Sequence, residues 1–526
     1  MGSSQISRRS FLTASAIGAA AVASPGLLAA CATPSQDDTA SASASSEAPK
    51  SGGILRVGMT GGGSTEALDP YYQFLAPDLA RCFALYSYIG EIDGQYRASP
   101  LLAESVESAD GSAKVWDIRL RAGLEFHNGK TVSSEDLIFS LNRMLDPEAQ
   151  SAAGLLVPWV DLKGLKAMDE RTVRVPLTQE VSVFKQALFN FLSTIVPVDF
   201  DPAKPVGAGP FKFGSFTAGD RSVFTRFENY FGGPAYADQL DIISFKDDAA
   251  LVNALLAGDI DVAGGLSAAN ANVVEAGGLP VISTPSMGWQ PLTMKMDAEP
   301  FTDPRVREAF RLIPDRNVML NQAFSGRGSV RKDLYGWNSG GYPADLADRA
   351  QDLEKAKSLL KEAGLENLTI DLATTPAFPG QVEICEVFAE QAKGAGVTVN
   401  VVKTTPDIYY SEYYLQAPFA SDTFVNVPYL NNTLQCQLPT SPYNGSAWSD
   451  AEFTALYEKA LATVDEAARD EVVAQMQKIQ YDRGALLIGT SFDGLDATGT
   501  QVRGLNSGEL WAYSLNGYHL ERVWFA

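Results

Sequence analysis

Segments with strand character and segments with helix character alternate along most of this 526-residue chain. A short apolar run follows two glycines at residues 54–59 and has the pattern of a strand. In "AKVWDIRLRAG", Trp116, Ile118 and Leu120 occupy every second position, as in a strand with one buried face. Strands that alternate with helices form mixed sheets covered by helices. The sequence therefore predicts an α/β fold.

Capping residues mark where several of the helices begin and end. Ser133, with Asp136 three residues later, resembles a capping box, and the helical pattern that follows ends at Pro147. The dipeptide Asn128-Gly129 just before it predicts a turn. The other expected elements are a helix ended by Gly258, a strand at 260–262, a helix begun by Asp303 and Pro304, a helix ended by Gly364, a strand at 397–402 and two helices within 451–482.

The first 30 residues have the pattern of an export signal. Arg8 and Arg9 precede an uncharged apolar run that is shorter than the roughly 20 residues of a membrane-spanning helix. Twin arginines direct the export of folded proteins. The run ends in "LLAAC", which resembles a bacterial lipobox, so we expect a lipid anchor on Cys31. Residues 31–51 are rich in Ser, Ala and Thr, and this composition predicts a flexible tether.

Charge and cysteine spacing exclude several classes of protein. The formal net charge is −22, which argues against nucleic acid as a partner, because phosphate binding needs clustered Lys and Arg. The three cysteines beyond the leader, Cys82, Cys385 and Cys436, are far apart and show no C-x-x-C spacing, so no zinc framework is expected. Their spacing leaves open whether any two of them form a disulfide.

No catalytic motif is visible. No serine has the G-x-S-x-G surroundings of a hydrolase nucleophile, and no P-loop is present. Of the two histidines, His127 precedes a turn and has no second ligand nearby, and His519 has no marked nucleophile to serve. The 63 acidic residues leave a carboxylate-pair hydrolase open as an alternative. We expect no enzyme, no cofactor and no metal site.

Four blocks, in the same order along the chain, carry a family resemblance. They are "SPLLAESVESADGSAKVWDIRLRAGLEFHNGKTVSSEDLIFSLNRMLDP", "GAGPFKFGSFTAGDRSVFTRFENYFGG", "DDAALVNALLAGDIDVA", and "FTDPRVREAFRLIPDRNVMLNQAFSGRG" with "DLEKAKSLLKEAG". Together they resemble the family 5 extracellular solute-binding proteins of peptide and nickel ABC importers, over nearly all of residues 52–526. In that family the "F-H-x-G" stretch is a structural turn, which implies a scaffold role for His127.

The resemblance implies a periplasmic-binding-protein-like fold of type II, in the three-region peptide-binding subclass. Its two lobes, built on mixed sheets, are joined by a hinge that the chain crosses twice, and they close on the ligand. By this analogy region I comprises residues 52–97, 205–287 and 496–526, region II comprises residues 98–204, and the second lobe, region III, comprises residues 288–495.

The resemblance also implies ligand-binding residues. Family members carry a W-x-x-D stretch whose carboxylate pairs with the free amine of a peptide, and "FASD" places Phe419 and Asp422 at these positions. Trp289 lies where the chain enters region III, close to the cleft of relatives. Gly62 and Ser64 belong to the "TGGGST" loop, which faces the cleft in the family and could present backbone N–H groups to an anion.

The function implied is that of a monomeric, lipid-anchored protein on the extracytoplasmic face of the cell membrane. It would bind di- or oligopeptides and deliver them to the permease and ATPase subunits of an ABC importer. An oligosaccharide or a metal chelate is the alternative ligand within the same transport role. An extracellular hydrolase, or a family member turned sensor or adhesion protein, represents a different class.

Overall fold

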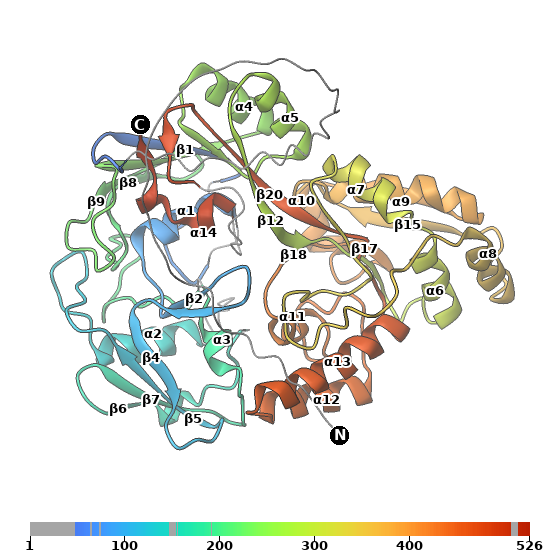
Figure 1. Ribbon diagram of the computed structural model, residues 1–526, viewed down its shortest axis with the longest axis horizontal. Coiled ribbons are helices and arrows are strands. Elements are labelled where there is room, and N and C mark those ends of the chain that lie inside the picture. The colour runs from blue at the N-terminus through green and yellow to red at the C-terminus, as the bar shows by residue number, and fades with distance from the viewer. Residues whose placement is uncertain are drawn as a thin grey trace, which may run out of the picture. The chain divides into compact units, whose positions relative to one another are not determined.

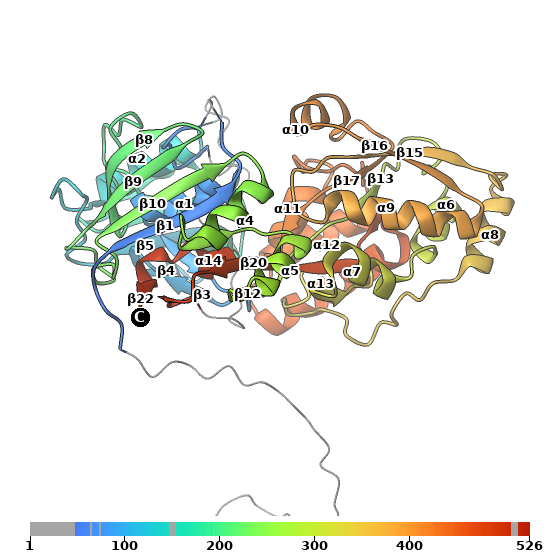
Figure 2. The ribbon, with the colours of Figure 1, turned by 90° about the horizontal axis from the view of Figure 1, so that it is seen from above.

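The computed structural model describes residues 48–63, 66–72, 75–146, 154, 156–190, 192–505 and 514–526. Two mixed sheets and a smaller antiparallel sheet, each packed against helices, form its framework (Figure 1; Figure 2). The leader and Cys31 lie outside the described residues. Among the helices that are described, none combines the length and apolar character needed to cross a bilayer.

The largest sheet has nine strands and is mixed. Its strand β1 (Ile54–Thr60) pairs in parallel with β10 (Gln239–Phe245) and β11 (Val262–Gly264). The other pairings are antiparallel, and the remaining strands are β8 (Phe211–Thr217), β9 (Arg221–Arg226), β12 (Val281–Trp289), β14 (Gly328–Val330), β18 (Phe424–Val425) and β20 (Thr490–Thr498). The order is β18-β12-β20-β11-β1-β10-β9-β8, with β14 beside β20, so β18 is an edge strand.

Helices α1 (Ala76–Leu85), α4 (Asp248–Ala257) and α5 (Ala268–Ala276) pack on the nine-stranded sheet, together with the short α14 (Ser514–Tyr518). The expected helix at α4 is confirmed: the Asp247 side chain accepts from the Ala250 N–H at its start, and Gly258 ends it with φ 78°. The strand after it begins at Val262 rather than at Ile260. Ile260 is instead a buried core residue of the connection, because Asp259 N–H still donates to Ala254 O of the helix.

The antiparallel sheet has four strands, in the order β4 (Ala103–Ser108), β5 (Val115–Leu120), β7 (Thr172–Pro176) and β6 (Lys166–Ala167). Every second residue of β5 is buried, as predicted. Helix α2 (Ser134–Met144) begins with the predicted capping box of Ser133 and Asp136. It ends at Met144, and Pro147 lies outside the described residues. The hairpin β2 (Gly90–Ile92) and β3 (Ala98–Pro100), helix α3 (Phe184–Leu188) and the 3-10 turn η2 (Leu162–Gly164) lie nearby in sequence.

The second mixed sheet has five strands, in the order β16 (Thr398–Lys403), β15 (Thr369–Thr374), β17 (Phe419–Ser421), β13 (Leu292–Met294) and β19 (Leu486–Leu487). β15 is parallel to both β16 and β17. The helices of this part are α6 (Pro304–Leu312), α7 (Arg316–Phe324), α8 (Leu353–Glu362), α9 (Gln381–Ala392), α11 (Tyr429–Cys436), α12 (Ala451–Ala462) and α13 (Glu466–Arg483). The predicted Asp303 cap of α6 and the two helices within 451–482 are confirmed.

Three short connections of the chain join the two mixed sheets. These are the connections from β12 to β13, from β17 to β18 and from β19 to β20. The Asp422 N–H donates to Pro291 O over 3.1 Å, which ties the first two connections together. The family resemblance predicts two crossings. In the structure β14 and β18 also belong to the nine-stranded sheet, so longer segments before and after β14 and after β18 pass between the sheets as well. The predicted region boundaries after residues 287 and 495 fall within β12 and β20, a few residues from the short connections, and the division into regions stays a prediction.

His127 fastens a turn to a neighbouring segment. Its main-chain N–H donates to Gly207 O over 2.8 Å, and the Gly207 N–H donates to Nδ1 over 3.3 Å. Nε2 therefore carries the proton and donates to Gly209 O over 3.0 Å. Burial lowers the pKa of His127 to about 4, so the ring is neutral at pH 7. His127 has the scaffold role predicted for it.

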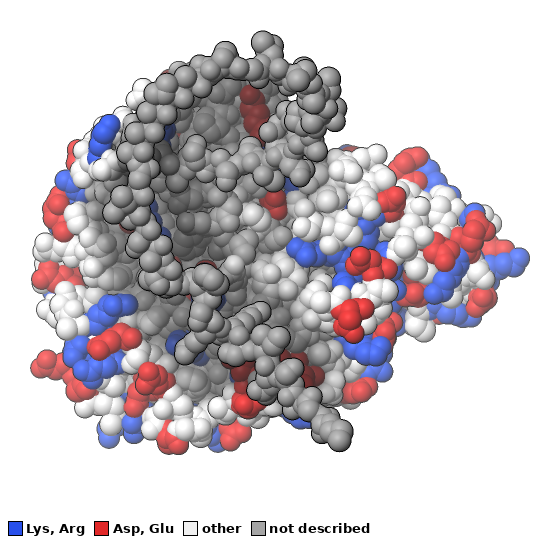
Figure 3. Space-filling view, in the orientation of Figure 1, with Lys and Arg blue, Asp and Glu red and all other residues white. Residues whose placement is uncertain are grey.

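Cys82, Cys385 and Cys436 are all buried free thiols. Burial raises the pKa of each thiol, so none is poised to react. On the face shown in Figure 3, acidic and basic side chains are interspersed wherever described residues are visible. An interspersed surface of this kind does not attract a phosphate backbone.

Candidate ligand-binding site

The crossing from β17 to β18 lies at the carboxyl end of the parallel strands of the five-stranded sheet. β17 is followed directly by Asp422, and β16 is followed by α10 (Pro406–Ile408) and a π-helical turn, Tyr409–Tyr413 (Figure 2). In α/β sheets ligands bind at carboxyl strand ends where chain connections diverge. π-Helical turns are frequent at functional sites. Both features place a candidate site around Asp422.

Asp422 is a carboxyl group without a cation. The Thr423 N–H donates to Oδ1 over 2.8 Å, and the Tyr414 hydroxyl donates to Oδ2 over 3.2 Å. Within the described part of the chain, no Lys, Arg or His forms an ion pair with it. Burial raises the pKa of Asp422 from 3.8 to about 7, and the two hydrogen bonds offset only part of this effect. The group is half-buried, so a ligand can reach it.

Four tyrosines surround this carboxyl group, and we refer to them as the tyrosine cluster: Tyr409, Tyr410, Tyr414 and Tyr443. The ring centroid of Tyr410 lies 5.4 Å from that of Tyr409 and 5.3 Å from that of Tyr414, and both pairs meet edge to face. Burial, and then the charge of Asp422, raise the pKa of Tyr410 to about 12 and also raise the pKa of Tyr443. All groups whose pKa responds to Asp422 are acids, so nothing described here neutralises its charge.

Two of the four hydroxyls of the tyrosine cluster form hydrogen bonds within the described part of the protein, and two do not. Tyr409 donates to Ser421 O, and Tyr414 donates to Asp422. The hydroxyls of Tyr410 and Tyr443 have no hydrogen-bond partner among the described residues. An ammonium group at Asp422 would find a carboxylate, free hydroxyl oxygens and aromatic rings, three kinds of group that attract a cation.

The edge strand β18 begins immediately after this site. The Asn426 N–H donates to Met287 O over 2.9 Å, toward β12. Because alternate residues of an antiparallel strand turn their main-chain groups to opposite sides, the N–H and C=O of Val425 face the free edge of the sheet. A ligand with an extended backbone could pair with this residue.

The two aromatic residues predicted to bind ligand, Phe419 and Trp289, are enclosed in the core. Phe419 is fully buried, and its ring packs against those of Phe301, Phe310 and Phe388. Trp289 is also fully buried, stacked between Tyr335 at 4.9 Å and Phe424 at 4.6 Å. A ligand cannot touch a side chain without exposed surface, so we leave Phe419 and Trp289 out of the candidate site. Both serve to pack the strands that hold Asp422 in place.

The glycine loop is only partly described. Gly62 is exposed and has φ 103°, a conformation that favours glycine, whereas Ser64 lies outside the described residues. A Cβ on Gly62 would lie 3.0 Å from Glu66 Oε1 and 2.8 Å from Ser244 Oγ. The Glu66 carboxylate also accepts from the Gly219 N–H and from Arg81. A carboxylate so close to Gly62 does not favour binding of an anion there.

The tyrosine cluster was not predicted from the sequence, although a signal exists. "DIYYSEYY" at 407–414 places four tyrosines within six residues, just before "FASD". Most tyrosines in a sequence are packing residues, so this run indicates a binding site only because it lies close to the carboxylate of Asp422.

His519 has a structural role. Burial by itself lowers the pKa of His519, but hydrogen bonds to Glu521 and Glu91 outweigh burial and raise the pKa to about 9. A histidine that is protonated at pH 7 cannot act as a general base.

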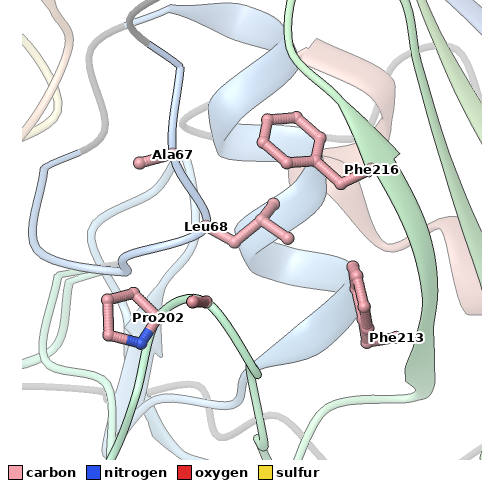
Figure 4. A pocket seen from close by; sticks show the side chains of 6 residues that line it. Ala67, Leu68, Pro202, Phe213 and Phe216 are labelled. Carbon is pink, nitrogen blue, oxygen red and sulfur yellow. The ribbon is translucent and has the colours of Figure 1, made fainter.

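Two surface hollows of about 330 Å³ each lie away from Asp422 in sequence and sheet. The first lies between β8 and the segments around Leu68 and Pro202, with Phe213 and Phe216 along one wall (Figure 4). The side chains that line it are all apolar, so it offers a ligand no polar side chain that would fix its orientation. The second adjoins it at Phe213 and includes His127, whose ring atoms are already committed. Neither hollow contains a predicted site residue.

Two mixed sheets linked by short connections of the chain define the fold of a type II periplasmic binding protein. A family model described as bacterial extracellular solute-binding proteins, family 5 Middle, matches residues 97–424. The chain belongs to this family. Its members are extracytoplasmic solute-binding proteins and not enzymes.

Curated relatives and solved structures resemble most of the chain. The oligopeptide-binding protein AppA of Bacillus subtilis (strain 168) is 26% identical over 396 residues, covering 69% of this chain and 72% of AppA. The dipeptide-binding protein of Escherichia coli (strain K12) is 25% identical over 454 residues, covering 77% and 83%. The structure of the binding protein AgaA of A. tumefaciens R10, in complex with agropinic acid, has a TM-score of 0.79 at 24% identity and covers 90% of this chain and 99% of AgaA.

Proposed function

We propose that this protein binds peptides outside the cell for an ABC importer, and that Asp422 binds the free amino terminus of the peptide. One observation carries the proposal: the carboxyl group of Asp422 has a raised pKa, can be reached by a ligand and forms no ion pair with a cation among the described residues. A peptide ammonium supplies the missing charge, and a charge-assisted hydrogen bond away from bulk water is strong. The names of the two curated relatives, an oligopeptide- and a dipeptide-binding protein, support this ligand class.

The peptide backbone would continue along β18. The N–H and C=O of Val425 can exchange two hydrogen bonds with one ligand residue, as in the addition of a strand to a sheet edge. Such contacts depend on the backbone and not on side chains, so peptides of different sequence can share them.

Transport then requires closure and transfer. The crossings between the sheets act as the hinge, and the ligand selects the closed form by its higher affinity for it. The closed monomer presents the peptide to a permease driven by ATPase subunits. The twin arginines at Arg8 and Arg9 export the folded protein, and a lipid on Cys31 keeps it at the extracytoplasmic face of the membrane. Mass spectrometry of the mature protein from the membrane fraction tests the anchor by its added mass.

The test of the amine assignment is a two-by-two titration by calorimetry. A peptide with a free amino terminus and its N-acetylated form are titrated into the wild type and into Asp422→Asn, which has the same shape and lacks the charge. We expect acetylation to weaken binding to the wild type by about 2 to 4 kcal/mol, the cost of truncating one side of a buried charge pair, and to have little effect on the variant. Equal affinity of the wild type for both peptides would refute the assignment.

A neutral ligand such as an oligosaccharide is the second candidate. The observation in its favour is the ring of Tyr410, which is 45% exposed, because sugars bind against aromatic faces. AgaA, which shares the fold, binds agropinic acid and shows that the fold is not restricted to peptides. A neutral ligand leaves the charge of Asp422 unpaired, so its binding would be insensitive to Asp422→Asn.

A further inference from the structure

Tyr410 exposes apolar surface near the carboxyl group of Asp422. Tyr410 is 45% exposed, whereas the adjacent Tyr409 is 1% exposed. The π-helical turn therefore begins with one anchored tyrosine and one exposed tyrosine. Aromatic side chains grouped around a polar group are typical of a ligand site.

The ring of Tyr410 is fixed in position although it is exposed. Its edge-to-face contacts with Tyr409 and Tyr414 have interplanar angles of 85° and 70°. Tyr409 is in turn held by the hydrogen bond from its hydroxyl to Ser421 O, and Tyr414 by its hydrogen bond to Asp422. A ring that is already held in place by its neighbours but is exposed to solvent loses little conformational entropy when a ligand covers it.

The same contacts connect the exposed ring to the amine site. Asp422 follows β17, and the turn that carries Tyr410 follows β16, and both of these strands are in the same sheet as β15. The charge of Asp422 contributes to the raised pKa of Tyr410, so the two groups lie within electrostatic reach. In a peptide whose ammonium group pairs with Asp422, the Cβ of the first residue is only two bonds away from the charged nitrogen, through Cα.

We propose that the ring of Tyr410 forms an apolar platform that receives the side chain of the first residue of the peptide. The protein then selects peptides that begin with an aromatic or large aliphatic residue, and it discriminates against glycine and acidic residues there. The platform rests on the proposed function, because it needs the amino terminus at Asp422 to bring that side chain to Tyr410. The uncommitted hydroxyl of Tyr410 makes no contribution to this preference, which comes from burial of the ring.

The test uses the tripeptides Phe-Ala-Ala, Leu-Ala-Ala and Gly-Ala-Ala, titrated by calorimetry into the full-length protein without its leader. The wild type should bind the first two more tightly than the third by about tenfold or more, because each covers apolar surface that glycine leaves exposed. Tyr410→Ala should bring the three affinities together, and Tyr410→Phe, which keeps the ring, should retain the preference. Phe213→Ala is the matched control, because it removes an aromatic ring that is 37% exposed on β8.

The outcomes separate the platform from the proposed function. If the three peptides bind the wild type equally and acetylation still weakens binding, the platform is overturned and the amine site stands. If Tyr410→Ala retains the preference, the platform is likewise overturned. If none of the peptides binds, or if acetylation has no effect, the proposed function fails and the platform fails with it. Tyr410→Leu, a smaller change, should reduce the preference in part, and it replaces Tyr410→Ala if thermal melting shows that the latter is unfolded.

Discussion

Asp422 illustrates how a binding residue can oppose the stability of the fold that carries it. In the unfolded chain its carboxyl group ionises near pH 3.8, whereas burial raises the pKa to about 7 in the fold. A charge without a partner is costly to bury, and the cost is recovered only when a cation arrives. Residues that prepare a site for its ligand in this way often reduce the stability of the free protein.

We therefore expect Asp422→Asn to stabilise the ligand-free protein. Because the folded pKa is higher than the unfolded one, the wild type loses stability as pH rises from about 4 to about 7, and the loss stays constant above that range. At pH 8 the variant should be more stable by ~1 to 3 kcal/mol, and at pH 4 the two proteins should be alike. Thermal or denaturant unfolding at both pH values measures the difference. A variant that is less stable than the wild type at pH 8 would show that Asp422 stabilises the free fold.

The stability contributed by His519 should also fall as pH rises, but over a higher pH range. Its folded pKa of about 9 lies above the usual 6.5, because Glu521 and Glu91 both accept hydrogen bonds from the ring. The stabilisation is complete below pH 6.5 and is lost as pH rises through about 9. We expect His519→Gln to be less stable than the wild type by ~1 to 3 kcal/mol at pH 6.5, with the difference shrinking toward pH 10. A difference that is constant over this range would mean that the ring acts by shape and not by charge.

At the scale of elements, the short strand β18 is central to the proposed binding of the peptide backbone. It comprises two residues, follows Asp422 directly and forms the edge of the nine-stranded sheet. Phe424 holds it to the core by stacking on Trp289, while Val425 is 36% exposed. One residue of the pair thus anchors the strand, and the other is available to a ligand.

The variant Val425→Pro tests whether the ligand adds to this edge. Proline lacks the N–H group but is tolerated on edge strands where that group faces away from the sheet. We expect the variant to fold and to bind peptides about tenfold more weakly or worse, because one backbone hydrogen bond is lost and its partner is left unpaired. Val425→Ala keeps the N–H and is the control. Unchanged affinity of the proline variant would place the peptide backbone elsewhere.

The elements with strong local signals could be predicted from the sequence, and the site could be predicted only in part. Capping residues such as Ser133 and Asp247 act within one turn of their helix, so a short stretch of sequence contains the whole signal. β18 has two residues, too few to show a periodicity, and its pairing with β12 depends on contacts more than 130 residues apart. Asp422 came from a family resemblance, and Phe419, predicted by the same resemblance, is a core residue.

At the scale of the whole molecule, two of the short connections between the mixed sheets meet at the candidate site, where the Asp422 N–H donates to Pro291 O. Contacts also join segments that the resemblance assigns to different regions: the Ser182 N–H donates to Leu461 O over 2.7 Å, and Asn338 donates to Gly94 O over 2.6 Å. The Tyr96 hydroxyl, from the turn between β2 and β3, donates to Asn426 just after β18. Contacts of this kind would form on closure and break on opening.

Small-angle scattering tests the closure. We expect the radius of gyration of the wild type to decrease when a binding peptide is added, because the ligand stabilises the form in which these contacts are made. In Tyr96→Phe, which removes one of the hydrogen bonds, more of the free protein should be open, so the decrease on binding should be larger and the affinity lower. An unchanged radius in the presence of a peptide that calorimetry shows to bind would contradict closure of two lobes.

The most direct test of the central claim is the number of protons released when a peptide binds. At pH 6 the carboxyl group of Asp422, with a pKa of about 7, is mostly protonated in the free protein, whereas the amino terminus of a peptide already carries its charge. Pairing the two requires an ionised carboxylate, so its proton must leave. Calorimetry at pH 6 in two buffers of different ionisation enthalpy should therefore report close to one proton released per peptide for the wild type and close to none for Asp422→Asn. Binding to the wild type without proton release would mean that Asp422 does not receive the amino terminus of the ligand.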